Sequence, residues 1–257
     1  MTYVSYLSAR GVVRNTLIIL ALGLVLFAVT VQHAHAGRIP WEQMGHMQLL
    51  ASMTGLAGFF ALIVATIRSS SLDVLTRTPA ITFTRPISRT VIALQNFALD
   101  AATIAIVWLI TLGILTAIIA AFGGIGYLGS PSDALVVVGL VGAVMVMWYG
   151  LVTLATTLFP ARGGAIVGIS WAAFIVTPAV ARIPFPQPVS GLLHALLFLD
   201  PMAYLTGIHG SISFGSDESD TSALIFSVGL RSAVAAVIGI IALAAAIQVW
   251  NRKDAVA

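Results

Sequence analysis

Six stretches of apolar residues, separated by polar intervals, constrain the fold of this chain more than any other feature. They cover residues 17–31, 47–67, 101–122, 134–158, 165–181 and 232–249. A helix of about 20 apolar residues crosses the hydrocarbon core of a bilayer. Only 8% of the residues are charged and 59% are hydrophobic, whereas soluble domains carry roughly 25% charged residues. The sequence therefore predicts an all-α integral membrane protein with six transmembrane helices, built as a single domain over residues 1–257.

The first stretch has a second interpretation. Residues 17–31 are short for a span unless each flank adds a turn. Ala34, His35 and Ala36 resemble the cleavage site of a secretory signal peptide, because they follow a basic flank and an apolar core. We expect a span here, and cleavage is the alternative.

The positive charges test the six-span topology, because cytoplasmic loops of membrane proteins are enriched in Lys and Arg. Six spans put both termini on one side. That side carries nine of the 12 basic residues and three of the nine acidic ones, while Arg38, Arg182 and Arg231 fall on the other. The two sides then have net charges of +6 and −3, which together give the net charge of +3. This distribution predicts that both termini lie in the cytoplasm.

The longest polar interval on the cytoplasmic side separates the second span from the third. Ser70 and Asp73 suit a helix N-terminus, Pro79 stops a helix, and Ser88 suits the start of the next one. The pattern predicts a helix of one to two turns over residues 71–77. A transporter driven by a separate soluble motor needs such a projection, and an ordinary basic loop is the alternative.

Two charged residues and several small ones bear on how the spans pack. Asp100 and Arg231 lie where apolar stretches begin. Each could simply anchor its helix at the membrane boundary. The alternative is a functional role, in which Asp100 would lock neighbouring spans together and Arg231 would face a route for an anionic substrate. Small residues at four-residue spacing predict close helix approach, in the pairs Ala51 and Gly55, Gly139 and Ala143, Gly164 and Gly168, Ala235 and Gly239.

Several kinds of chemistry are missing from the 257 residues. There is no cysteine, which excludes disulfides and thiolate-bound metals within this sequence. No G-x-x-x-x-G-K-[ST] phosphate loop occurs, so this sequence predicts no ATP hydrolysis of its own. Its basic residues are too sparse for a nucleic-acid surface. The span interiors hold almost no ionisable groups, which favours an external motor over coupling to an ion gradient.

The five histidines all fall on the outer side in this topology: His33, His35, His46, His194 and His209. Imidazole groups are common ligands of copper and zinc. No third ligand has a fixed spacing, however, so we expect no metal site. A non-transport membrane protein, either an enzyme with an outer metal site or an assembly scaffold, is the alternative function.

An apolar segment between the fifth and sixth spans is too short to cross a membrane. Residues 189–199 are apolar, and Asp200 and Pro201 follow them. About 11 residues cannot span a bilayer, yet water would solvate them poorly. We expect this segment to dip into the membrane and return at Pro201. A helix lying flat on the surface is the alternative.

Two short motifs resemble type-2 ABC permeases, the membrane subunits of bacterial exporters. Residues 84–89 read Thr-Arg-Pro-Ile-Ser-Arg, similar to the Arg/Lys-Pro-x-Ser-Arg element that follows the second span of that family. Residues 199–204 read Leu-Asp-Pro-Met-Ala-Tyr, similar to its Pro-Leu-Thr-Tyr element between spans five and six. Gln95 and Asn96 stand where the family usually has Gly-Lys.

The resemblance implies a fold and a set of partners. It implies an interfacial helix at the N-terminus, a cytoplasmic coupling helix between spans 2 and 3, and a re-entrant helical hairpin made from residues 189–199 and 202–212. The chain would then be a transport subunit and not an enzyme, in the bacterial inner membrane. It would pair with a second permease and with two ABC ATPase subunits, and the ATPases would hold the ATP and Mg²⁺.

The expected functional residues form three groups. ATPase coupling is assigned to Leu72, Asp73, Arg77, Arg85 and Arg89. The outer gate is assigned to Leu197, Asp200, Pro201 and Tyr204, and a substrate route to Arg231.

Overall fold

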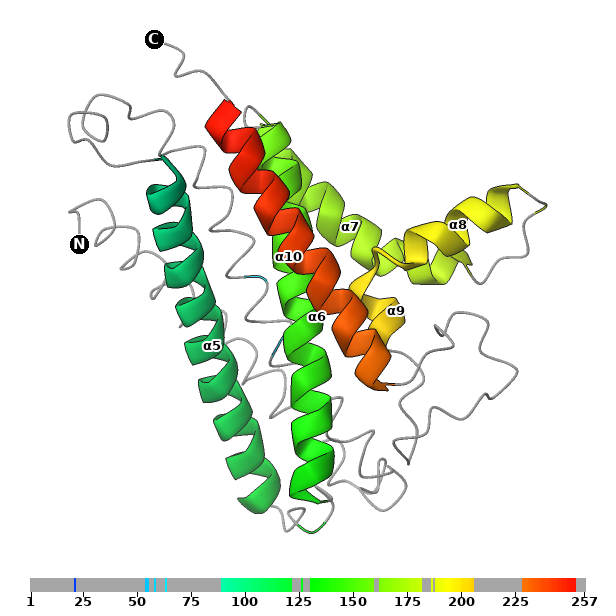
Figure 1. The fold of residues 1–257 in the computed structure, drawn as a ribbon. Coiled ribbons are helices and arrows are strands. Elements are labelled where there is room, and N and C mark those ends of the chain that lie inside the picture. The colour runs from blue at the N-terminus through cyan, green and yellow to red at the C-terminus, as the bar shows by residue number, and fades with distance from the viewer. Residues whose placement is uncertain are drawn as a thin grey trace.

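The structure, a computed structural model, describes about half of the chain. The described residues are 54–55, 58, 63, 89–121, 130–159, 162–181, 188–205 and 228–252, with Ala21, Gly126 and Pro186. They form helices and turns, with no strand among them. The helices are α5 (Arg89–Ala121), α6 (Pro131–Leu158), α7 (Gly163–Ala181), α8 (Val189–Leu197), α9 (Pro201–Leu205) and α10 (Val228–Arg252) (Figure 1).

Three of these helices are long and apolar enough to cross a membrane: residues 93–120 of α5, all of α6 and all of α10. At 1.5 Å per residue, each exceeds the roughly 30 Å of a hydrocarbon core. They coincide with three of the predicted spans, and α7 coincides with a fourth. The stretches at 17–31 and 47–67 lie largely outside the described residues. In them, Ala21, Thr54, Gly55, Gly58 and Ile63 are helical.

Two helix boundaries can be compared with the signals in the sequence, the start of α5 and the end of α7. α5 begins at Arg89, directly after Ser88, as the sequence predicts. α7 contains Pro178 near its end and continues to Ala181. A proline lacks the N–H that would bond the carbonyl four residues earlier. That loss removes one backbone bond near the end of the helix, and the helix continues for three residues beyond it.

The start of α6 is fixed by its own side chains. Ser130 is the N-cap, its hydroxyl accepts from the Asp133 N–H at 3.2 Å, and the Asp133 carboxylate accepts from the Ser130 N–H at 3.4 Å. Pro131 occupies the first turn, where a helix needs no proline N–H. This capping box satisfies backbone donors that the helix itself leaves open.

α6 and α10 form the tightest helix pair in the described part of the chain. A Cβ added to Gly150 would lie 2.5 Å from the Gly239 carbonyl oxygen, and one added to Gly239 would lie 2.6 Å from the Val146 carbonyl. The two backbones therefore touch. The predicted close approach at Ala235 and Gly239 is confirmed, because both are buried there.

The glycines of the other predicted pairs do not pack in this way. A Cβ added to Gly55, Gly139, Gly164 or Gly168 would meet nothing within 4 Å. Spacing alone therefore identifies small residues but does not decide which of them face a neighbouring helix.

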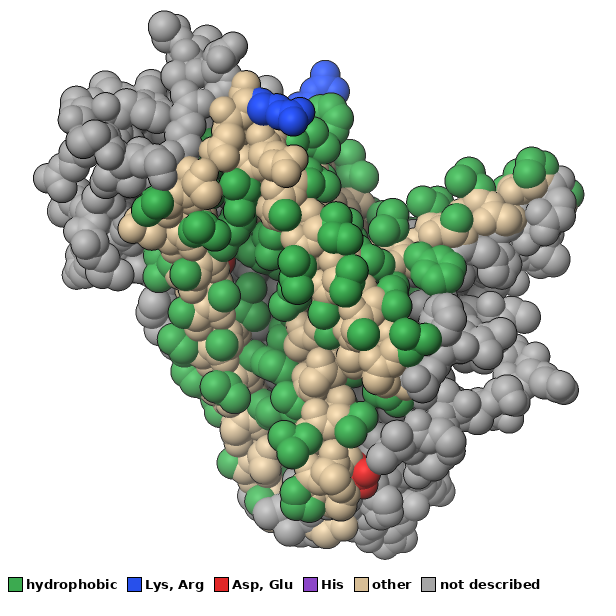
Figure 2. Space-filling model, in the orientation of Figure 1, with side chains coloured by type: hydrophobic (Ala, Val, Ile, Leu, Met, Phe, Trp, Pro, Cys, Tyr) green, Lys and Arg blue, Asp and Glu red, His purple; other side chains and the backbone are tan. Residues whose placement is uncertain are grey.

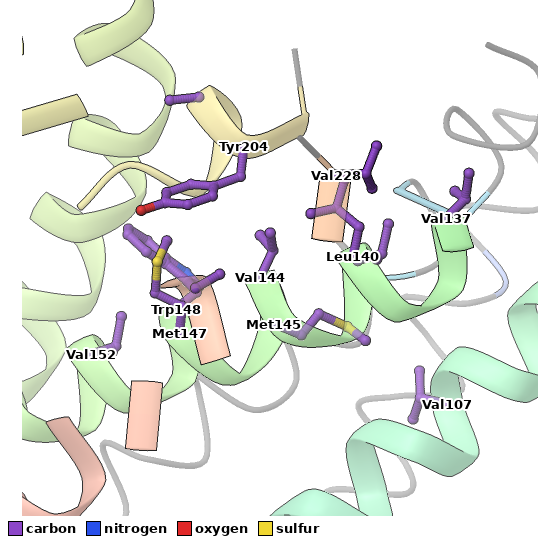
Figure 3. Close-up of a cluster of buried hydrophobic side chains, with 13 residues drawn as sticks. Val107, Val137, Leu140, Val144, Met145, Met147, Trp148, Val152, Tyr204 and Val228 are labelled. Carbon is purple, nitrogen blue, oxygen red and sulfur yellow. The ribbon is translucent and has the colours of Figure 1, made fainter. Parts of the chain in front are cut away.

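The apolar core lies where α6 meets α9, α10 and one face of α5. Figure 3 shows Tyr204 of α9 lying over Trp148, Met147 and Val144 of α6. Trp148 also packs edge-on against Trp171 of α7, with ring centroids 5.8 Å apart. The remaining cluster members include Val107 of α5 and Val228 of α10.

Three basic residues lie near one end of the bundle, whereas Arg231 lies in the first turn of α10, toward the other end of that helix. α5 starts with Arg89, α7 follows the exposed Arg162, and α10 ends at the exposed Arg252, all near one end (Figures 1 and 2). Asn251 of α10 donates to the Thr90 hydroxyl of α5 at 3.0 Å, which places these two helix ends side by side. Asp133 lies in the first turn of α6, at the opposite end.

Candidate functional site

Most of the expected ATPase-coupling residues lie outside the described part of the chain. This applies to Leu72, Asp73, Arg77 and Arg85, to the expected helix over residues 71–77, and to the expected interfacial helix at the N-terminus. Arg89 is the first residue of α5. Coupling at these positions remains a prediction.

The expected outer gate falls on the turn between α8 and α9. The last turn of α8 closes with the Phe198 N–H donating to the Ala195 carbonyl at 3.2 Å and the Leu199 N–H donating to the Leu196 carbonyl at 2.9 Å. Asp200 follows, and Pro201 opens α9. Proline suits the first turn of a helix because it has no N–H to leave unpaired. The chain therefore reverses into α9 at Asp200 and Pro201.

Tyr204 anchors this turn in the core. Its side chain is 0% exposed, and its hydroxyl donates to the Phe198 carbonyl at 2.8 Å. The phenol thus satisfies a backbone acceptor at the end of α8, six residues back along the chain. Burial raises the pKa of Tyr204 above its ordinary value of 10.0, because the buried site disfavours the phenolate.

The two helices of this segment differ in their surroundings. α9 is buried at Pro201, Ala203 and Tyr204, and Asp200 before it is buried as well. α8 instead projects from the bundle (Figure 1) and exposes apolar side chains, among them Leu192 at 64%. Leu197 lies in α8, but its side chain is not among those described. Residues 206–212 of the expected hairpin lie outside the described residues.

Arg231 occupies the first turn of α10, one turn beyond Val228. It is 1% exposed and is the largest fully buried side chain in the described part of the chain. Val228 belongs to the same apolar cluster as Tyr204. Val228 packs α10 into the cluster that contains Tyr204 of α9, and Arg231 follows Val228 by three residues. Its assignment to a substrate route remains a prediction.

A buried polar contact between α5 and α6 involves a residue that the sequence interpretation did not select. The Tyr149 hydroxyl donates to Oδ2 of Asp100 at 2.5 Å, and both side chains are buried. Phe97, one turn earlier on α5, packs edge-on against Tyr149 with ring centroids 6.2 Å apart. This hydrogen bond joins Asp100 of α5 to α6, and that Asp100 locks neighbouring spans stays a prediction. The sequence offered no signal for this pair, because 49 residues separate Asp100 from Tyr149 and only the tertiary arrangement brings them together.

Five buried or part-buried threonines form hydrogen bonds within their own helices. The hydroxyls of Thr103, Thr111, Thr116, Thr156 and Thr157 each donate to a carbonyl three or four residues earlier in the same helix, at 2.6–3.1 Å. Such bonds satisfy a hydroxyl in an apolar setting without a partner helix. These threonines therefore give no site of their own.

No group of three or more His, Asp or Glu side chains comes together among the described residues. The outer histidines lie outside those residues, except His194, whose backbone alone is described in α8. The expected lack of a metal site is thus untested.

Comparisons of the chain with protein-family models, with curated proteins and with solved structures found no match.

Proposed function

We propose that this chain is the membrane-spanning permease subunit of an ATP-driven ABC exporter, with separate ATPase subunits as its motor. The substrate is exported by alternating access: ATP binding brings the motor subunits together, and the bundle opens to the outer side. The two motifs at residues 84–89 and 199–204 indicate this class, and the described helices are compatible with it.

The observation that carries the proposal is the turn from α8 to α9. α8 has nine residues and α9 has five, so neither crosses a bilayer. The second motif places Asp200, Pro201 and Tyr204 at the point of reversal, and all three are buried against the bundle. A helical reversal held in the core beside long spans suits an outer gate, because it closes a path without crossing the membrane.

The distribution of charge supports the orientation that the proposal needs. Arg89, Arg162 and Arg252 lie near one end, and Asp133 and the buried Arg231 lie toward the other. Cytoplasmic ends of membrane proteins are enriched in basic residues. In the proposed orientation, α5 emerges at the basic end, where an ATPase subunit docks on residues 71–89.

The motor contact is tested by reconstituting the chain in lipid with an ABC ATPase encoded beside it. We expect the pair to hydrolyse ATP and to transport. Replacing Leu72, Asp73 and Arg77 together by alanine should leave hydrolysis uncoupled from transport. Arg252→Ala is the matched control, because it removes an exposed basic side chain near the same end. Unchanged coupling in the triple variant, or no association with the ATPase, contradicts the proposal.

The membrane position of α8 is tested by labelling, since the chain has no cysteine of its own. Leu192→Cys and Ser132→Cys both replace side chains that the protein leaves exposed. A membrane-impermeant maleimide added from outside should modify the cysteine at position 132 quickly and the one at 192 slowly, because lipid would cover α8. The same contrast is expected between Leu197→Cys and Ser216→Cys. Equal, fast labelling at 192 and 132 would make α8 a surface helix and remove the gate.

A further inference from the structure

α5 meets α6 at two levels that differ in chemistry. At the first, Tyr149 donates to Asp100, the one side-chain hydrogen bond that joins described residues of α5 and α6. At the second, the ring of Trp108 lies beside Gly142, where an added Cβ would be 3.6 Å from it. Eight residues separate Asp100 from Trp108, and seven separate Gly142 from Tyr149. The two levels are therefore about 11 Å apart on both helices.

The first level is a short hydrogen bond between two buried side chains. An oxygen separation of 2.5 Å falls in the range of a hydroxyl donating to a carboxylate. Both side chains are buried, so water does not compete for either group. Asp100 also lies 11 residues into α5, about 16 Å from its start at Arg89.

α6 and α10 are joined in a different way. Their backbones touch at Gly150 and Gly239, and Ala235, Ala242 and Ala246 are buried along the same helix. Close-packed backbones allow little relative motion. Movement within the described bundle is therefore easier between α5 and the α6–α10 pair than between α6 and α10.

We propose that the Asp100–Tyr149 hydrogen bond is a latch that holds α5 against α6 and opens when the starting end of α5 moves. The role of the latch in transport rests on the proposed function, because that function brings the motor's movement into the membrane at residues 71–89. The opening itself is a property of this chain and needs no ATPase to be observed.

The test is cysteine reactivity in the purified chain in lipid nanodiscs. Ala93→Cys reports on the latch, because Ala93 is buried on α5 two turns before Asp100 and therefore on the same helix face. Ala246→Cys is the internal standard. It makes the same change at an equally buried position of α10, six residues from the end of that helix. N-ethylmaleimide reacts at a rate that follows the opened population when reclosing is faster than labelling.

Tyr149→Phe removes the donor and should raise the labelling rate at position 93 by at least about tenfold, the loss expected for a hydrogen bond to a charged acceptor. Asp100→Asn keeps an oxygen that can accept from Tyr149 but removes the charge, so it should raise the rate by a smaller factor. The rate at position 246 should not change. Combining the two substitutions should add little to Tyr149→Phe alone, because the donor is already gone. Thr103→Val is the control, because it removes a hydroxyl that bonds only within α5, to the Leu99 carbonyl.

Two results would overturn the latch. Unchanged labelling at position 93 in both variants means that the bond does not hold α5. An equal rise at positions 93 and 246 means that the bond stabilises the whole fold without gating a local opening. If one substitution prevents folding, the other carries the test, since Tyr149→Phe keeps the ring that packs on Phe97 and Asp100→Asn keeps the side-chain shape. Because no ATPase is present, the latch can fail while the transport proposal stands.

Discussion

Replacing Gly239 with alanine should force α6 and α10 apart. The new Cβ would lie 2.6 Å from the carbonyl carbon and oxygen of Val146 and 2.7 Å from the Met147 nitrogen. Ordinary van der Waals contact begins near 3.4 Å, so the backbones must separate by about 0.8 Å, the difference between 3.4 and 2.6. These neighbours are backbone atoms of a helix and cannot rotate away as a side chain would.

The magnitude follows from two opposing effects. Inserting a methyl group into a packed interface costs about 1–3 kcal/mol, whereas exchanging glycine for alanine within a helix contributes up to about 1 kcal/mol of stability. We expect Gly239→Ala to destabilise the protein by about 1–2 kcal/mol. Gly168→Ala is the matched control, since its Cβ meets nothing within 4 Å, and it should be neutral or stabilising. Gly58→Ala should fall between them, because its nearest neighbours are the Val141 and Met145 side chains.

The assay is reversible unfolding in mixed detergent micelles, followed by tryptophan fluorescence. Trp148 lies in the core beside α9, so its emission reports the loss of this packing. The three glycine variants should unfold in the order Gly239→Ala, Gly58→Ala, Gly168→Ala. If Gly239→Ala proves as stable as Gly168→Ala, α6 and α10 do not touch at this point.

Three further predictions concern the buried hydroxyl of Tyr204 and the N-cap of α6. Tyr204→Phe should cost about 1 kcal/mol, the net value of one hydrogen bond, because the Phe198 carbonyl loses its donor; thermal unfolding measures this. Burial raises the pKa of Tyr204. The contribution of Tyr204 to the free energy of unfolding should therefore be complete below pH 10 and decline as the pH rises through its folded-state pKa. The unfolding of Tyr204→Phe above pH 10 should not show this decline. Ser130→Ala should cost about 1 kcal/mol by removing the cap of α6. Ser132→Ala removes only an exposed hydroxyl 2.7 Å from that of Ser130 and should cost less in the same measurement.

The part of the fold that could be predicted came mostly from the lengths of the apolar stretches and from signals for helix starts. The stretches at 101–122, 134–158 and 232–249 are the cores of α5, α6 and α10, because about 20 apolar residues in sequence leave few alternatives to a spanning helix. The shortness of residues 189–199 and the proline after them predicted a segment that returns at Pro201. The structure ends α8 at Leu197 and begins α9 at Pro201.

The pairing of helices could not be predicted in the same way. Gly239 and Gly168 both follow a small residue at four-residue spacing, yet Gly239 touches α6 and Gly168 faces open space. In an apolar helix the hydrophobic residues lie on every face, so periodicity does not identify the packed side. Tyr149 was missed for the same reason: its partner Asp100 is 49 residues away, and only the tertiary arrangement brings them together.

The unequal lengths of the packed helices bear on the bilayer that suits this protein. α6 has 28 residues and α10 has 25, which correspond to about 42 Å and 38 Å. A hydrocarbon core of roughly 30 Å is shorter than either. Because the two helices touch at Gly150 and Gly239, they cannot adjust to the membrane independently and must tilt together or thicken the lipid around them. Bilayer thickness therefore acts on the pair as a unit, and lipids with longer acyl chains should relieve the mismatch and reduce its tilt.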